Sequence, residues 1–213
     1  MTADTGYELV PLDCPSCGAA VAAEGEDVVY YCTACRNGYS FDAGRRALEP
    51  LEVSFLSAPN VAAELWLPFW MLPAVVDVQR REAYGGFSGL MSFFVGDGGA
   101  PGIGPGEGTF AIPAFDCPLE AVTALSRAYT IHAPELGERL GERLVGGRYG
   151  PHDARKLAHY ALIASEVGKP DTLQRLEYTI DFGEPRLLGV PFSQDEKGRW
   201  VDSLLGVARI ERR

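Results

Sequence analysis

The feature that most constrains this chain is a pair of CxxC motifs close to its start. Each motif brings two thiol groups to one tight turn, and the fourteen residues 18–31 separate the two motifs. Two such turns together supply four soft ligands, the tetrahedral set that zinc prefers. The sequence therefore predicts one zinc ion in a short N-terminal β-ribbon, held by Cys14, Cys17, Cys32 and Cys35.

This predicted metal site is of the structural class. A shell of four cysteines leaves no coordination position for water or substrate, and zinc has no redox chemistry of its own. Gly18 follows the first motif and permits a left-handed turn there. After the second motif, Asn37 or Gly38 is expected to supply the same backbone freedom.

Composition and charge exclude several classes of function. The chain has 29 acidic and 19 basic residues, so its field repels nucleic acid and anionic membranes. The longest apolar stretch, residues 65–76, contains two prolines and is too short to span a bilayer. No secretory pattern opens the sequence, and paired CxxC motifs suit a reducing compartment. We therefore expect a cytoplasmic protein without a membrane span.

The remaining pattern predicts an α+β fold, in which a zinc ribbon (1–47) precedes a mostly antiparallel sheet domain with two main helices (48–213). Apolar residues alternate over 173–182, which is typical of a half-buried strand. A helix is predicted after Asp116 and another over 153–167, with Asp116 and Asp153 as caps. Further strands are expected over 51–56, 62–78, 86–95, 109–115, 187–192 and 200–210. Because Pro68 and Pro73 cannot donate ladder hydrogen bonds, the strand over 62–78 is expected to be an edge strand, bulged or bent.

Part of the chain resembles a group of bacterial proteins. The first motif, Cys-Pro-x-Cys-Gly, is similar to that of widespread bacterial zinc ribbons. Leu67-Pro68-Phe69-Trp70 and Ile112-Pro113-Ala114-Phe115 resemble bacterial proteins that join such a ribbon to an "LPFW"-bearing β-rich domain of uncharacterised function. A helicase label attached to some of those proteins does not transfer, because this sequence lacks the loop that holds nucleotide.

Four weaker candidates lie outside the ribbon, and each also has an ordinary structural explanation. An aromatic cluster could form a partner-docking surface on one face of its strand and core on the other. Cys117 could be a reactive thiol at a helix start, although a buried thiol is the more common case. The glycine-rich loop 96–108 is acidic and unsuited to phosphate, and His152 and His159 are too far apart to share a metal ion. The candidate docking residues are Trp66, Phe69, Trp70 and Met71.

Three functional hypotheses follow, none resting on a catalytic motif. The first is a non-enzymatic accessory or adaptor protein that contacts other proteins in a larger assembly. The second is an enzyme whose active site is dispersed through residues 48–213. The third is a nucleic-acid-binding zinc ribbon, which the acidic charge disfavours.

Overall fold

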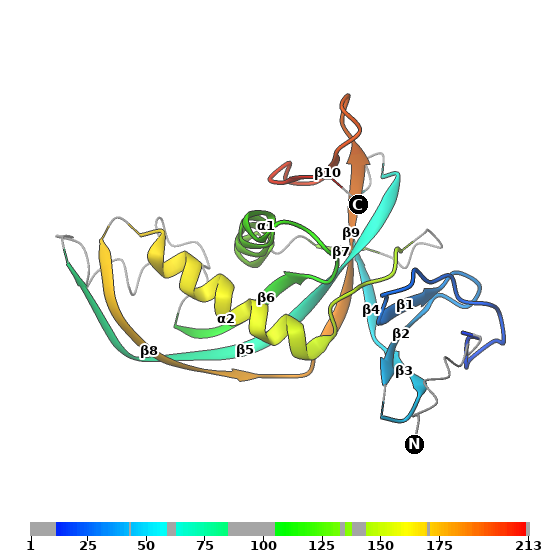
Figure 1. Cartoon of the computed structure of the whole chain (residues 1–213), viewed down its shortest axis with the longest axis horizontal. Helices are drawn as coiled ribbons and strands as arrows, with labels where there is room; N and C mark the ends of the chain where they lie inside the picture. Colours follow the sequence, from blue (N-terminus) through cyan, green and yellow to red (C-terminus); the bar gives the residue numbers. More distant parts are fainter. Residues whose placement is uncertain are drawn as a thin grey trace, which may run out of the picture.

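The computed structural model describes residues 12–42, 44–58, 63–84, 105–132, 135–137, 144–169 and 171–211, and it confirms the predicted fold class. A three-stranded antiparallel sheet contains β1 (Val29–Cys32), β2 (Asn37–Asp42) and β3 (Ala47–Leu51). A larger, mostly antiparallel sheet and two helices complete the described fold (Figure 1). The larger sheet and helices are β4 (Val53–Leu56), β5 (Leu65–Tyr84), β6 (Gly106–Pro113), β7 (Leu136–Gly137), β8 (Thr172–Phe182), β9 (Arg186–Gln194), β10 (Trp200–Asp202), β11 (Arg209–Ile210), α1 (Leu119–Ile131) and α2 (Pro151–Val167).

β5 is the organising strand of the larger sheet. Along one edge it pairs with β6, and along the other it pairs first with β9 and then with β8, all antiparallel. β9 in turn pairs in parallel with β4 and antiparallel with β10. β5 and β8 curve together as a long ribbon, and α2 lies along its concave side (Figure 1).

The expectation of an edge at the two prolines is confirmed locally, because at each of them β5 has a partner strand on one side only. Pro68 pairs with Gly189 of β9, one residue before the pairing with β6 begins, and Pro73 pairs with Thr109 of β6, between the stretches that pair with β9 and with β8. The carbonyl of Pro68 accepts from Ala114, just beyond the end of β6, and that of Pro73 accepts from Gly183, in the gap between β8 and β9. The irregularities in the β5–β8 pairing lie further along, between Val78 and Arg80 and between Glu82 and Ala83.

Both predicted helices are present, but neither uses the predicted cap. The N-cap of α1 is Pro118 and that of α2 is Gly150, and neither cap makes a side-chain hydrogen bond. Proline at the first position of α2 suits a helix start because its ring fixes φ and the first N–H needs no partner. Asp153 therefore lies inside the first turn of α2, where its negative charge interacts favourably with the helix dipole.

The three-stranded sheet is attached to the larger one through shared core. Tyr31 of β1 packs edge-on against Phe55 of β4, and Phe55 packs edge-on against Trp66 of β5. The backbone of Val29 exchanges hydrogen bonds with Gly147. β3 continues the small sheet to residue 51, past residue 47, and the division of the chain into two domains stays a prediction.

Several expectations fall wholly or partly outside the described residues. The strand predicted over 86–95 and most of the glycine-rich loop lie there, while Gly106 and Gly108 belong to β6. Residues 136–137 form the short strand β7, for which the sequence analysis has no counterpart. Within the described ranges, neither helix is long and apolar enough to cross a membrane.

Candidate metal centre

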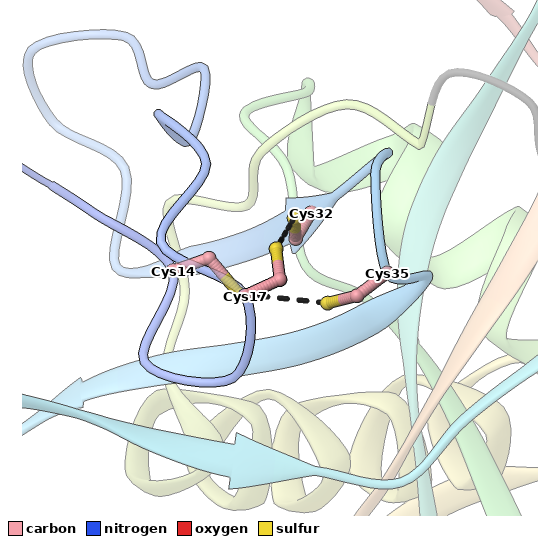
Figure 2. A group of neighbouring side chains, drawn as sticks. All are labelled: Cys14, Cys17, Cys32 and Cys35. Atoms are coloured by element: carbon pink, nitrogen blue, oxygen red, sulfur yellow. Dashed lines mark hydrogen bonds between the residues drawn. The ribbon is translucent and has the colours of Figure 1, made fainter.

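The four cysteines of the two CxxC motifs meet at one end of the three-stranded sheet (Figure 2). Cys14 and Cys17 lie in a tight turn, closed by a hydrogen bond from the N–H of Gly18 to the carbonyl of Cys14. Gly18 has the expected positive φ of 73°. Cys32 ends β1, and Cys35 lies in the turn that leads into β2.

The second turn differs from the prediction in one respect. Its left-handed residue is Arg36, with φ 61°, rather than Asn37 or Gly38. Its N–H donates to the carbonyl of Cys32 at 2.7 Å, which closes the turn one residue earlier than expected. Asn37 and Gly38 are already paired in β2, so they have extended rather than left-handed backbone.

The distances between the sulfur atoms fit a tetrahedral metal site. Cys14 Sγ lies 3.5 Å from Cys35 Sγ, Cys17 Sγ lies 3.6 Å from Cys32 Sγ, and all four lie within 4.8 Å of one another. Four sulfurs at about 2.3 Å from a central zinc would be about 3.8 Å apart. A disulfide would need about 2.05 Å, so these cysteines are not paired covalently. Among the described residues, this is the one group of three or more cysteine, histidine or carboxylate side chains arranged to hold a metal ion.

A buried tyrosine, Tyr39, lies next to the four cysteines and contacts the sulfur of Cys14. The hydroxyl of Tyr39 lies 3.1 Å from Cys14 Sγ and 2.8 Å from Ser16 Oγ, and the side chain is fully buried. Burial and the Cys14 sulfur raise the pKa of Tyr39 to about 12, so the hydroxyl keeps its proton at neutral pH. Burial by itself would raise the pKa of Cys14, but hydrogen bonds from Tyr39 and the backbone of Ser16 lower it to about 6. The pKa of Cys17 shifts the other way: a backbone hydrogen bond at Ala19 lowers it, but the neighbouring cysteine sulfurs and burial raise it to about 12. Metal binding therefore has to displace the Cys17 proton.

We expect Tyr39→Phe to weaken zinc binding about tenfold while the fold is retained, because partners of this kind orient and stabilise metal ligands. A metal-bound thiolate has no proton, so a hydrogen bond to Cys14 needs the single hydroxyl proton of Tyr39, for which Ser16 Oγ competes as an acceptor at 2.8 Å. A competition titration with a chromophoric chelator measures the affinity. Tyr30→Phe is the matched control, since Tyr30 lies in the same small core and its hydroxyl donates to the carbonyl of Asp27 instead of a sulfur. Equal affinities for both variants would contradict the assigned role of Tyr39.

The predicted docking cluster is core. Trp66, Phe69 and Trp70 are between 0% and 2% exposed, and Met71 is half-buried. Both faces of this part of β5 are covered, one by Phe55 and the other by Phe115 and Tyr129 of the segment around α1. The docking hypothesis is therefore wrong for the three buried residues, because no part of them is available to a partner.

The remaining candidates have ordinary surroundings. Burial and the Asp116 carboxylate raise the pKa of Cys117 to about 12, which opposes a nucleophilic role. His159 Nδ1 lies 3.2 Å from the hydroxyl of Tyr178, and its ring packs against Phe182. These contacts account for His159 as part of the packing of α2 on β8.

Comparisons of this chain with family models, with curated proteins and with solved structures found no match. The resemblance to ribbon proteins with an "LPFW"-bearing domain thus rests on the quoted motifs alone and stays a prediction. The metal centre rests on its own geometry: four clustered cysteines in a β-rich chain that could bind a metal ion.

Proposed function

We propose that Cys14, Cys17, Cys32 and Cys35 bind one structural Zn²⁺, and that the protein is a non-enzymatic accessory or adaptor protein of the cytoplasm. The single observation that carries the metal assignment is the set of sulfur distances, which match a tetrahedral zinc–thiolate shell. With four sulfurs bound, the ion has no vacant position, so its contribution is to hold the small sheet together.

The adaptor role is supported by how the ion organises the small sheet. The core around the cysteines contains few buried residues, and such a small core cannot stabilise a fold by itself. The metal makes β1, β2 and β3 a rigid unit, and β1 is attached to the larger sheet through Val29 and Tyr31. A rigid, acidic unit of this kind suits contacts with other proteins better than contacts with nucleic acid.

Two measurements test the proposal. Elemental analysis of the purified full chain is expected to find one zinc per chain. Native mass spectrometry of the tagged chain, purified from the organism that encodes it, is expected to find a stoichiometric complex that a Cys32→Ser variant no longer forms. A chain that holds zinc but is recovered only as a free monomer would refute the adaptor role and leave the metal assignment standing.

A further inference from the structure

A cavity of about 390 Å³ lies between the turn that precedes β1 and the larger sheet. Its walls come from segments far apart in the sequence: the turn before β1, β5, the segment before α1, the residues around 146, and the C-terminal strands β10 and β11. Its volume is within the range of small-molecule sites, which often form where two units of a protein meet.

The inner wall of this cavity is apolar and partly aromatic. Leu67, Phe115 and Ile210 are buried and contribute to the lining, and the half-buried Trp200 adds an indole ring. Apolar walls favour a ligand with a hydrocarbon or aromatic body, and the face of an aromatic ring also attracts a cation.

The polar groups around the cavity carry mostly negative charge. Four carboxylates and one guanidinium line it. The guanidinium belongs to Arg148, whose Nη1 lies 3.0 Å from Glu26 and 3.6 Å from Asp116, so its charge is already offset. Among the lining residues that the structure describes, negative charges outnumber positive ones four to one, and this balance favours cations over anions. The four lining carboxylates are Glu24, Asp27, Asp116 and Glu211.

The deepest of these carboxylates is held firmly in place. Asp27 is 9% exposed, and its Oδ2 accepts a hydrogen bond of 2.8 Å from the N–H of Glu24. The backbone passes close to Asp27 at Gly146. A Cβ atom added to this glycine would lie 2.0 Å from Asp27 Oδ2, so a larger residue has no room there. The Asp27 carboxyl is thus held in position between the turn before β1 and the segment around residue 146.

The cavity suits reversible binding better than covalent chemistry. Its one thiol, Cys117, has a pKa raised to about 12 by burial and Asp116, so it is neutral at physiological pH. Among the lining residues that the structure describes, no histidine is present that could act as its base.

We propose that this cavity binds a small organic cation with an apolar body, of the arylalkylammonium or guanidinium class. The charge lies among the carboxylates, and the body packs on Leu67, Phe115 and Trp200. This site is additional to the proposed function, and its occupant need not be part of the assembly.

The test uses the metal-loaded full chain and follows the indole N–H signals of its three tryptophans by NMR. Phenethylammonium is expected to shift the signal of Trp200, while those of the buried Trp66 and Trp70 stay unchanged. It should bind about tenfold more tightly than neutral 2-phenylethanol, and anionic phenylacetate should bind least. A second titration, with Nα-acetyl-arginine methylamide, distinguishes the source: tighter binding of this probe would identify the cation as an arginine side chain of a partner protein.

Two variants separate the site from the general acidity of the chain. Glu24→Gln combined with Glu211→Gln removes two exposed lining charges and should weaken phenethylammonium about tenfold. Glu184→Gln together with Asp181→Asn, both exposed and outside the lining, should change nothing. Equal binding of the charged and neutral probes, equal effects of the two variants, or no shift of Trp200 at about 10 mM probe would each overturn the proposal.

Discussion

Cys32→Ser is expected to lower the affinity for zinc by at least about 100-fold and to unfold the three-stranded sheet. Structural zinc sites contribute about 10–16 kcal/mol, so one of four ligands accounts for about 3 kcal/mol. The substitution also places a polar hydroxyl in the small core around the metal, because the side chain of Cys32 is only 1% exposed. Competition with a chromophoric chelator measures the affinity, and hydrogen exchange of the β1 and β2 amides measures the loss of structure.

The loss is expected to spread into the larger sheet. Val29 and Tyr31 of β1 belong to the main core, where Tyr31 covers an edge of Phe55. When the small sheet unfolds, this apolar surface is exposed. The midpoint temperature of thermal unfolding of the larger sheet should therefore fall by several degrees.

Cys117→Ser is the matched control for this prediction. Cys117 is half-buried and is the one cysteine outside the four-sulfur cluster. The Cys117→Ser protein should keep one zinc per chain with unchanged affinity. A Cys32→Ser protein that binds zinc as tightly as the unaltered chain, or a Cys117→Ser protein that loses it, would refute the assignment of the four ligands.

The features that the sequence alone could predict are those set by local spacing. The ligand set follows from two CxxC turns, and the strand over 173–182 follows from a period of two that the structure retains as β8. The two helices could also be predicted from local sequence, because each is an unbroken stretch with helical spacing. The helix caps could not be predicted in this way, because Gly150 and Pro151 begin α2 before the predicted cap, Asp153.

The features that the sequence could not predict depend on partners far away in the chain. Arg81 donates hydrogen bonds of 2.7 Å to both Glu166 and Asp171, which are 85 and 90 residues distant, and no local pattern marks this buried network. The cavity also depends on distant segments, since its lining is drawn from the turn before β1, from strands of the larger sheet and from the segments around residues 116 and 146. Aromatic composition alone likewise could not decide whether Trp66 and Trp70 are core or surface, because that depends on what covers each face of β5.

Asp202→Ala is expected to destabilise the protein by about 4 kcal/mol, because one carboxylate satisfies several buried donors. Asp202 is 1% exposed, and its Oδ1 accepts hydrogen bonds of 2.8 Å from the Tyr129 hydroxyl and 2.7 Å from the N–H of Leu205. Its Oδ2 accepts one of 2.6 Å from the N–H of Val207. These contacts fold the loop between β10 and β11 and join it to α1. Denaturant unfolding monitored by circular dichroism measures the change.

Two further variants show that the carboxylate itself is responsible. Tyr129→Phe removes one donor and should cost about 1 kcal/mol, and its effect should be largely absent when Asp202 is already alanine, since both changes break the same bond. Asp181→Ala, which removes an exposed carboxylate on β8, should change the free energy of unfolding by less than about 0.5 kcal/mol. If Asp202→Ala were no more destabilising than Asp181→Ala, the loop between β10 and β11 would have to be held by its apolar contacts alone. The role of Asp202 as the link between this loop and α1 would then be wrong.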